Sequence, residues 1–230
     1  MNILCTICAR GGSKNLKNKN FKKINDKLLI EYTIEQAIKA KIYKKIVLSS
    51  DDKKIFKIGK KYNLDVWFLR PKKLSSDTSA KIPVIKHALL EAENFYQLKF
   101  DSIHDLDVTS PLRKISDIVM AHKKFVSENS NNLVSGCIAR KNPYFNMIEI
   151  DKNKKIYISK GKNNSFIRRQ DVPSVYELNA SIYIWKRKYL LNNSNLLNLK
   201  TSFFEMPQER SIDIDSKFEW KIVESILKNK

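Results

Sequence analysis

The chain has 230 residues, of which 42% are hydrophobic, and it carries a formal net charge of +20. This length fits one large domain with a single core of ordinary size. No apolar run approaches the roughly 20 residues that a membrane helix needs, and the short apolar start lacks a basic leader and a small-residue cleavage site. We therefore expect a cytoplasmic protein that does not enter a membrane.

Lysine supplies most of the positive charge, and it is spread along the chain together with many Asn and Ile residues. Nucleic acid is bound by basic residues that gather in a patch, because neutralised phosphates release their counterions. None of the common nucleic-acid-binding signatures occurs in the sequence. A basic nucleic-acid-binding protein stays an alternative, but the composition favours a partner that is a small polyanion, such as a nucleotide, and no nucleic acid.

Apolar patterning predicts alternating strands and helices in the first half of the chain. We expect strands within residues 2–8, 45–52, 65–70 and 100–113, and helices within residues 28–41, 53–63, 82–97 and 115–129. The third strand, "DVWFLR", would stop at Pro71. This alternation indicates a parallel sheet with helices on both faces. Ligands would then lie beyond the carboxyl ends of the strands, where the polar loops converge.

The pattern changes after Val134. Strand-like pieces separated by polar turns cover residues 133–139, 146–150, 155–159 and 180–185. We expect residues 140–175 to form a hairpin that projects from a single domain of residues 1–230. A final helix is predicted within residues 217–230, with an apolar side made of Phe218, Ile222, Ile226 and Leu227.

Two of the three cysteines, Cys5 and Cys8, form a C-x-x-C pattern inside the first predicted strand. Side chains three residues apart in a strand point to opposite faces of the sheet. We therefore expect two buried free thiols that act as small hydrophobic residues, and neither a disulfide nor a zinc site.

A pair of glycines follows the first strand in "ARGGSKNLKNKN". Gly11 and Gly12 allow the backbone to approach a ligand closely and to turn successive N–H groups inward, which creates an anion site. Arg10 and Lys19 would add positive charge for a polyphosphate. The spacing matches neither a P-loop nor a dinucleotide fingerprint, so a solvated basic loop is the alternative interpretation.

An acidic pair lies near the other end of the chain, in "ERSIDIDSKFEW". In an extended segment Asp213 and Asp215 point to the same side, whereas Ile214 between them points into the core. Two close carboxylates repel each other unless a cation lies between them, and Mg²⁺ prefers carboxylates combined with substrate phosphates. The alternative is a polar turn in which Ser216 caps the final helix.

Five blocks occur together in one order: "ARGGSKNLKNKN", "FLRPKKLSSDTSAK", "LDVTSPLR", "RRQDVPSVYELNASIYI" and "SIDIDS". In these blocks nearly the whole chain resembles the CMP-nonulosonate synthetases, the acylneuraminate cytidylyltransferase family that contains CMP-sialic acid synthetase. Within this family the chain is most similar to the CMP-legionaminic acid synthases. The resemblance implies an α/β, Rossmann-like nucleotide-diphospho-sugar transferase fold with a mainly parallel sheet and a projecting β-hairpin that forms a homodimer.

The resemblance also implies a Mg²⁺-dependent cytidylyltransferase that joins CTP to a nonulosonic acid, with N,N′-diacetyllegionaminic acid as the first expectation. The products would be the CMP-sugar and pyrophosphate. The alternatives are synthesis of CMP-N-acetylneuraminate or CMP-pseudaminate, or a related cytidylyltransferase for 3-deoxy-manno-octulosonate.

Site residues are carried over from the matching blocks. The nucleotide contacts are Arg10, Gly11, Gly12, Ser13, Lys19, Asn20, Arg70, Ser76, Asp77 and Thr78. The contacts to the sugar acid are Asp107, Thr109, Arg169, Gln170, Tyr176, Asn179 and Ser181. The metal pair is Asp213 and Asp215, and these two residues form the catalytic set together with Arg10 and Lys19. In the relatives the arginine that matches Arg169 reaches the active site of the neighbouring subunit and pairs with the C1 carboxylate of the sugar acid.

Two positions depart from the sialic acid enzymes, which usually carry Gln where this chain has Asp107 and Gly where it has Ala180. An ionised aspartate can only accept hydrogen bonds, so Asp107 should select a substrate that offers N–H or O–H groups at that point. This difference points away from N-acetylneuraminate as the substrate and leaves the nucleotide end unchanged.

Overall fold

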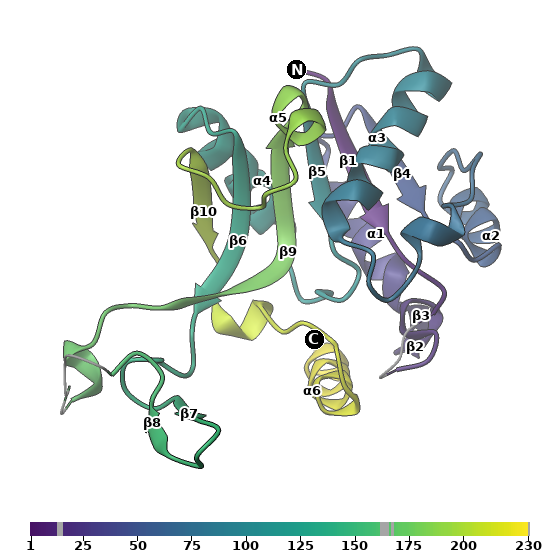
Figure 1. Ribbon diagram of the computed structural model, residues 1–230. Helices are drawn as coiled ribbons and strands as arrows, with labels where there is room; N and C mark the ends of the chain where they lie inside the picture. Colours follow the sequence, from purple (N-terminus) through teal and green to yellow (C-terminus); the bar gives the residue numbers. More distant parts are fainter. Residues whose placement is uncertain (13–15, 162–165, 167, 230) are drawn as a thin grey trace.

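The computed structural model describes residues 1–12, 16–161, 166 and 168–229. Its centre is a six-stranded sheet with the strand order β10-β6-β9-β5-β1-β4 (Figure 1). The strands are β1 (Ile3–Cys8), β4 (Lys45–Ser49), β5 (Ser102–Leu106), β6 (Asn132–Ile138), β9 (Tyr176–Lys186) and β10 (Thr201–Glu205). All neighbouring strands run parallel except β9, which is antiparallel to both β5 and β6. The prediction of a mainly parallel α/β sheet is confirmed.

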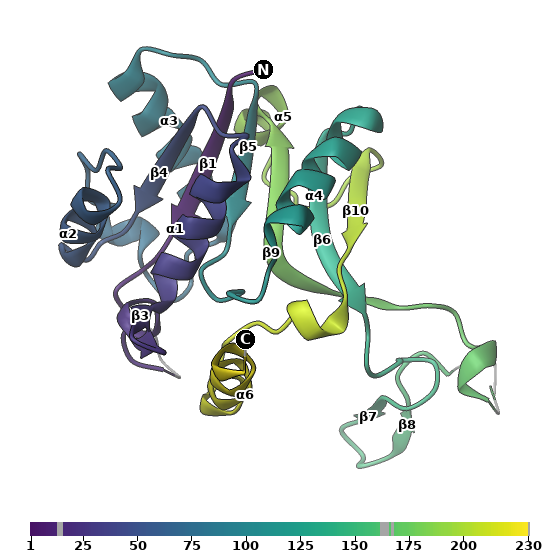
Figure 2. The ribbon, with the colours of Figure 1, turned by 180° about the vertical axis from the view of Figure 1, so that it is seen from behind.

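Helices cover both faces of the sheet, as expected. Figure 2 shows α1 (Leu29–Ala40) and α4 (Ile115–Ser127) on one face, and α2 (Lys54–Lys61) packs into the same core. The opposite face carries α3 (Lys81–Tyr96) and α5 (Arg187–Asn192) (Figure 1). The last helix, α6 (Lys217–Lys228), lies below the lower end of the sheet. None of the helices that the structure describes is long and apolar enough to cross a membrane.

Alternating side chains of the strands fill two hydrophobic cores, one on each face. In β9, Ile182 and Ile184 belong to the core under α1 and α4, whereas Tyr183 and Trp185 belong to the core under α3. The two cysteines of β1 follow the same rule, because Cys5 lies in the first core and Cys8 packs against the second. Both thiols are free, and burial raises the pKa of each. The expectation of unpaired hydrophobic thiols is confirmed, although Cys8 is only partly buried.

The predicted strand over residues 65–70 was wrong, since this segment forms no strand. Its side chains do alternate: Val66 packs towards one core, and Trp67 packs towards the other and stacks on Phe95 with ring centroids 4.1 Å apart. Its backbone is joined to the end of β4 by the hydrogen bond from Arg70 N–H to Ser50 C=O, at 2.7 Å. Packing on two cores produced the strand-like pattern without a ladder of backbone hydrogen bonds.

Three elements were not predicted: β10, α5 and a short hairpin made of β2 (Lys23–Ile24) and β3 (Lys27–Leu28). The hairpin turns through Asn25 and Asp26, which both have positive φ, of 49° and 63°. A two-residue turn between antiparallel strands requires this left-handed conformation, and Asn and Asp adopt it most readily after Gly. The hairpin returns the chain from the loop after β1 to the start of α1.

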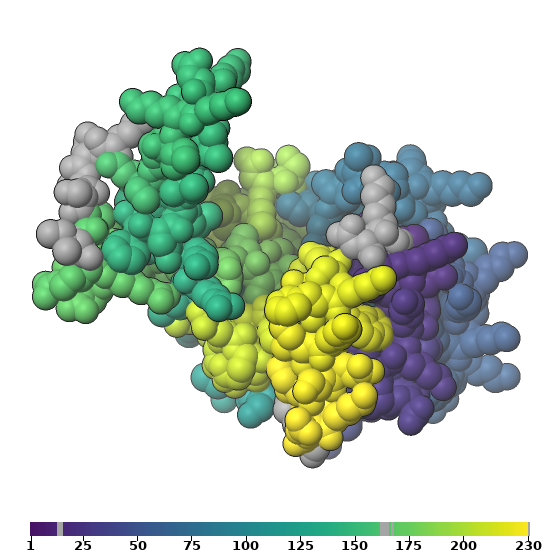
Figure 3. All heavy atoms as spheres, turned by 90° about the horizontal axis from the view of Figure 1, so that it is seen from below, coloured from purple at the N-terminus to yellow at the C-terminus, as the bar shows by residue number. Residues whose placement is uncertain are grey.

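The segment that contains β7 (Ile148–Ile150) and β8 (Ile156–Ile158) stands apart from the sheet, beyond the ends of β6 and β9 (Figures 1 and 3). We call residues 140–175 the arm; within it, residues 162–165 and 167 are not among the described residues. Isoleucines of both arm strands are exposed: Ile148, Ile150 and Ile156 have exposed fractions of 57%, 64% and 62%. The arm therefore carries apolar side chains that this chain does not cover.

Helix α6 begins where it was predicted, and Ser216 caps it, as in the alternative interpretation of the acidic segment: the Oγ atom accepts a hydrogen bond from Phe218 N–H at 3.1 Å. Glu219 completes a capping box by accepting from Ser216 N–H at 2.8 Å. The predicted apolar side was wrong at Phe218, which is exposed. Val223 is the residue of α6 that is fully buried.

The ladder between β6 and β9 contains a bulge between Val134 and Gly136. Ser135 leaves the ladder, and its Oγ accepts from Ile182 N–H at 2.8 Å and donates to Asn179 Oδ1 at 2.6 Å. Opposite it, Ala180 adopts a left-handed conformation with φ of 52°. The bulge bends the two strands at the point where they leave the sheet for the arm.

Gly136→Ala should destabilise the fold, because a Cβ atom at this position would lie 2.5 Å from Glu177 O and 2.7 Å from Phe203 Cε2. Overpacking of this kind costs about 1–3 kcal/mol, which urea unfolding would measure. Gly12→Ala is the matched control, since nothing lies within 4 Å of its added Cβ. Equal unfolding free energies for the two variants would contradict the close approach at Gly136.

Candidate active site

A pocket of about 300 Å³ opens where β1 and β5 end. Segments far apart in the sequence line it: the end of β1 and the loop after it, residues 70–84, the loop after β5, and the segment before α6. Its predicted site residues are Arg10, Lys19, Asn20, Arg70, Ser76, Asp77, Asp107, Thr109, Asp213 and Asp215. The structure thus brings the basic loop at the front of the chain and the acidic pair near its end into one pocket.

A lysine joins these two ends directly. Lys19 Nζ donates to Asp215 Oδ1 at 2.8 Å and to Ile214 C=O at 2.6 Å. Figure 3 shows the last part of the chain, in yellow, packed against the first part, in purple. Ile214 between the two acids is fully buried, as predicted, and its N–H donates to Thr109 C=O at 3.0 Å. The acidic segment is therefore anchored to the core, to the loop after β5 and to the basic loop.

The nucleotide side of the pocket holds two arginines. Arg10 Nη1 forms an ion pair with Asp77 Oδ1 at 2.7 Å and donates to Ser76 C=O at 3.2 Å. Arg70 is buried and donates from Nη2 to Ser49 C=O at 3.0 Å, while its Nε atom is buried without a partner among the described residues. Asn20 donates to Arg10 C=O at 3.0 Å, and its Oδ1 atom is also buried and unpaired. Unpaired buried polar atoms are costly, so these two atoms are suited to contact a polar ligand.

The glycines have a different arrangement from the one predicted. Gly11 N–H donates to Asp51 Oδ1 at 2.8 Å, so this group faces a carboxylate and is not turned towards an anion. Neither glycine has positive φ, and neither is among the described residues that line the pocket. Ser13 lies outside the described residues, and Thr78 contacts Ser76 through their hydroxyl groups at 3.2 Å. The glycines shape the loop, and the long basic side chains enter the pocket.

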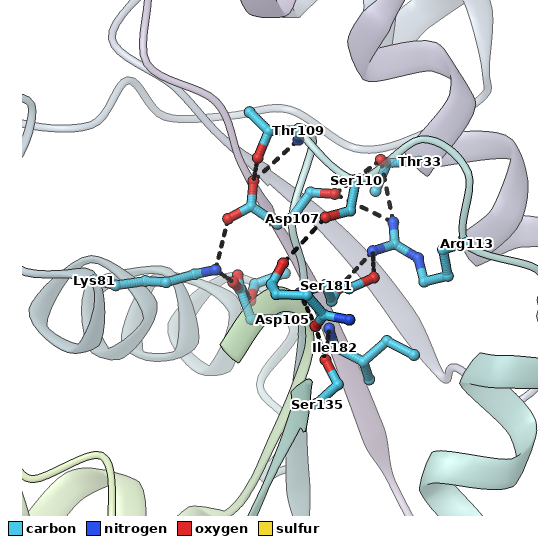
Figure 4. A network of polar contacts seen from close by, with 12 residues as sticks. Thr33, Lys81, Asp105, Asp107, Thr109, Ser110, Arg113, Ser135, Ser181 and Ile182 are labelled. Carbon is cyan, nitrogen blue, oxygen red and sulfur yellow. Dashed lines mark hydrogen bonds and ion pairs between the residues drawn. The ribbon is translucent and has the colours of Figure 1, made fainter. Parts of the chain in front are cut away.

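Asp107 is held by neighbours on both of its oxygens (Figure 4). Oδ1 accepts from Thr109 N–H at 3.1 Å and from Thr109 Oγ1 at 2.9 Å, and Oδ2 lies 2.7 Å from Lys81 Nζ. Burial alone would raise the pKa of Asp107, but the Lys81 charge and these hydrogen bonds lower it to about 2. The sequence predicts Asp107 as a hydrogen-bond acceptor for the substrate, and the structure adds that its carboxylate is paired with a lysine.

Arg113, which the sequence did not identify as a site residue, fixes the loop after β5 (Figure 4). Its buried guanidinium donates from Nη1 to Ser181 C=O and Oγ, and from Nη2 to Thr33 Oγ1 and Asp107 C=O, both at 3.2 Å. Nη1 thus holds β9, and Nη2 joins α1 to the loop after β5. The sequence offered one signal for this role: Arg113 ends the block "TSPLR", in the predicted strand and loop that also carry Asp107.

The other residues assigned to the sugar acid do not line this pocket. Ser181 is fully buried against Arg113, and Asn179 lies in the bulge, where Oδ1 accepts from Ser135 Oγ and Nδ2 donates to Ser211 Oγ at 2.9 Å. Tyr176 packs on Phe203 in the outer part of β9. The remaining two, Arg169 and Gln170, lie in the arm, beside a separate hollow of about 200 Å³.

Residues 4–222 match the family described as Cytidylyltransferase. The chain belongs to the cytidylyltransferase family. It is 47% identical to Post-translational flagellin modification protein B of Campylobacter coli over 99% of this chain and 96% of that protein. It is 45% identical to CMP-N,N′-diacetyllegionaminic acid synthase of Campylobacter jejuni over 98% of this chain and 94% of that protein. The enzyme is therefore a nucleotidyltransferase, as predicted.

The fold of this cytidylyltransferase also matches a solved structure. A CMP:2-keto-3-deoxy-manno-octonic acid synthetase complexed with CTP superposes with a TM-score of 0.71, covering 100% of this chain and 99% of that chain. The identity is 14%, so this likeness concerns the fold alone. It agrees with the nucleotide-diphospho-sugar transferase fold expected from the sequence.

The acidic pair of this cytidylyltransferase has the properties of a cation site. Burial raises the pKa of Asp213 to about 6, with a further contribution from the negative charge of Asp107. Asp213 Oδ1 is buried and has no hydrogen-bond partner in the part of the chain that the structure describes, while Asp215 is exposed and pairs with Lys19. Among the described residues no group of three or more His, Cys, Asp or Glu side chains is placed to hold a metal by itself. A cation here therefore needs further oxygen ligands, which a bound phosphate can supply.

Asp213→Asn should stabilise the protein at neutral pH when divalent cations are removed. The pKa of Asp213 in the folded state, about 6, lies above its ordinary value of 3.8, so its ionisation costs stability as the pH rises between these values. The variant should gain up to about 3 kcal/mol at pH 7.5 and nothing at pH 3.5. Urea unfolding in EDTA at both pH values measures this difference.

Asp26→Asn, in an exposed turn that Asn also fits, is the control and should show no such gain. An Asp213→Asn variant that is no more stable than the wild type at pH 7.5 would contradict the raised pKa.

Proposed function

We propose that this cytidylyltransferase uses CTP and Mg²⁺ to activate a nonulosonic acid, N,N′-diacetyllegionaminic acid, and forms the CMP-sugar and pyrophosphate. The observation that carries the proposal is the single pocket in which Arg10 and Lys19 meet Asp213 and Asp215. The name of the Campylobacter jejuni relative, at 45% identity over nearly the full length, supports the choice of sugar acid. We also propose a cytoplasmic location, because the reaction consumes CTP.

The basic residues of the pocket suit the triphosphate. Arg10 and Lys19 come from the loop after β1, and Arg70 lies at the end of the segment 65–70. The three side chains bring positive charge to the lining of the pocket. Planar guanidinium groups bind phosphate oxygens through paired hydrogen bonds, whereas a lysine acts as a mobile point charge. On CTP binding, Arg10 would exchange Asp77 for phosphate oxygens, and Lys19 would turn from Asp215 towards them.

The acidic pair suits a magnesium ion. Asp213 offers an unpaired buried oxygen, and Asp215 offers an exposed carboxylate whose present partner, Lys19, is itself a cation. Magnesium prefers one or two carboxylates combined with substrate phosphates, which is the donor set that this pocket and CTP offer together. When bound, the ion would stabilise negative charge on the phosphate oxygens and favour ionisation of the attacking hydroxyl.

The chemistry requires charge stabilisation and positioning more than proton transfer by the protein. The anomeric hydroxyl oxygen attacks the α-phosphorus of CTP. The bond from the α-phosphorus to the oxygen that bridges to the β-phosphorus breaks, and pyrophosphate leaves. The proton of the hydroxyl group is released to solvent. Arg10 and Lys19 would neutralise the charge that grows on the leaving pyrophosphate. No histidine is among the described residues that line the pocket, so none is assigned as a base.

The identity of the sugar acid is tested by offering substrates in competition. Purified enzyme with CTP and Mg²⁺ receives equal amounts of N,N′-diacetyllegionaminate, N-acetylneuraminate, pseudaminate and 3-deoxy-manno-octulosonate, and mass spectrometry identifies the CMP-sugars. We expect the CMP-N,N′-diacetyllegionaminate product to dominate. Preferred formation of another CMP-sugar would reject the proposed acceptor, and release of no pyrophosphate with any acceptor would reject the proposed reaction.

Asp215→Asn should lower turnover by roughly 100-fold or more, because it removes a carboxylate at nearly constant volume. The fold should stay intact, since an exposed ion pair such as Lys19–Asp215 contributes little to stability. Pyrophosphate release at increasing Mg²⁺ concentration separates a weakened metal site, which more Mg²⁺ partly rescues, from a misfolded protein. Normal turnover at low Mg²⁺ would exclude Asp215 as a metal ligand.

We further propose that the arm forms a homodimer and carries Arg169 towards the pocket of a second subunit. Two observations support this arrangement: the arm exposes several isoleucines, and Arg169 is exposed with a hydrogen bond to Arg140 C=O at 3.2 Å. Exposed contiguous apolar side chains are typical of interaction surfaces. Arg169 of a second subunit would pair with the C1 carboxylate of the sugar acid, because Lys81, the cation beside Asp107, is already paired with two carboxylates.

The double variant Ile148→Glu/Ile156→Glu should be monomeric, because charges would replace apolar contacts at the arm interface. Light scattering after gel filtration measures the mass. Leu199→Glu, at another exposed apolar residue far from the arm in sequence, should remain dimeric. A dimeric arm variant, or a monomeric wild type, would reject the proposed interface.

A further inference from the structure

The first residue of α3, Lys81, lies in the pocket wall and has no part in the function described so far. Its Nζ atom lies 3.0 Å from Asp105 Oδ2 and 2.7 Å from Asp107 Oδ2, between the two carboxylates (Figure 4). The same ammonium group lies 5.0 Å from the centre of the Tyr183 ring. Lys81 is thus enclosed by two negative charges and an aromatic face.

Each of the two carboxylates is fixed a second time. Asp105 is fully buried in β5, and its Oδ1 accepts from Thr6 Oγ1 of β1 at 2.8 Å. Asp107 is fixed through Oδ1 by the N–H and hydroxyl groups of Thr109. Neither carboxylate can rotate without breaking these bonds, so Lys81 is held between two rigid acceptors. The position of the Lys81 ammonium group therefore determines how much negative charge the pocket wall presents to a ligand.

The pocket holds charged groups of both signs. Arg10, Arg70 and Lys19 line it together with Asp107 and Asp213, and the negative charge of Asp107 acts on Asp213. The basic groups attract a triphosphate, whereas the two carboxylates repel it unless a cation lies between them and the phosphates. Lys81 reduces the negative charge of Asp107 and leaves an acceptor position on its carboxylate. Asp107 is thereby suited to the uncharged polar groups of an acceptor substrate.

We propose that Lys81 and Asp107 act as one fixed ion pair that contacts hydroxyl and acylamino groups of the sugar acid, with Lys81 as the positioning residue. This inference rests on the proposed function. Thr109 uses both lone pairs of Asp107 Oδ1 and Lys81 uses one of Oδ2, so Oδ2 keeps one lone pair for a substrate N–H or O–H group, and Lys81 keeps the carboxylate from turning towards the cation site at Asp213. Specificity for the sugar acid then depends on Lys81, which directly follows the segment that carries the predicted nucleotide contacts Arg70 to Thr78.

The test compares Lys81→Met with the wild type, using Lys86→Met on the same helix as the control, because Lys86 is not among the described residues of the pocket. We expect the KM for the sugar acid to rise about tenfold or more, as for loss of a hydrogen-bonding network that involves charged groups. The dissociation constant for Mg²⁺–CTP, measured by calorimetry without the sugar acid, should change less than twofold. Lys86→Met should leave both values unchanged.

Two further variants cover a failure of Lys81→Met to fold, which its melting temperature reports. Lys81→Met/Asp107→Asn removes one charge of each sign from the wall and should show the same loss for the sugar acid; its melting temperature is measured too, because Asp105 stays buried and keeps the hydrogen bond from Thr6 Oγ1. Lys81→Arg keeps the charge and should retain part of the wild-type affinity. In the double variant, removal of Lys81 should add little to the effect of Asp107→Asn alone, because the two residues act as one unit.

Three results would overturn the inference: an unchanged KM for the sugar acid, a loss confined to CTP affinity, or fully additive effects of Lys81→Met and Asp107→Asn. A loss confined to CTP would assign the ion pair to the nucleotide instead. These results are distinct from a failure of the proposed function, in which the wild-type enzyme itself forms no CMP-sugar.

Discussion

The contact of Lys19 with Ile214 and Asp215 is the interaction on which the site depends, since it joins two segments 196 residues apart. It exists because parallel strands bring their carboxyl ends to one edge of the sheet, where the loop after β1 meets the segment before α6. Positive and negative groups are thereby collected in one pocket. A magnesium–triphosphate complex needs both, since its phosphates require cations and its metal requires carboxylates.

The sequence predicted the parts of the fold that depend on local patterning. Helices α1, α3 and α4 appear within a few residues of the expected ranges, because their apolar residues recur at helical spacing. Residues 65–70 misled the interpretation, since their alternation comes from packing on two cores and not from sheet pairing. Strand β10 was missed because its five residues lie among polar turns, and only pairing with β6 defines it.

The candidate site was predictable to a similar extent. The resemblance to a family placed Arg10, Arg70 and Asp215 in one pocket, which local patterning could not do. It gave no role to Arg113 or Lys81, because their partners come from other elements and are visible only in three dimensions. The glycine pair illustrates the opposite error: its backbone freedom suggested an anion site, yet Gly11 N–H donates to Asp51.

The burial of Ile214 between the two acids has a consequence for the proposed cation site. Because this side chain is anchored in the core, the backbone that carries the two carboxylates is positioned before any ion arrives. Binding then requires little loss of conformational entropy from the protein, and the folding energy of the domain maintains the two carboxylates in close proximity despite their repulsion. Affinity for the proposed ion is in this sense coupled to hydrophobic packing: loosening the core around Ile214 would weaken the proposed site without altering a single oxygen ligand.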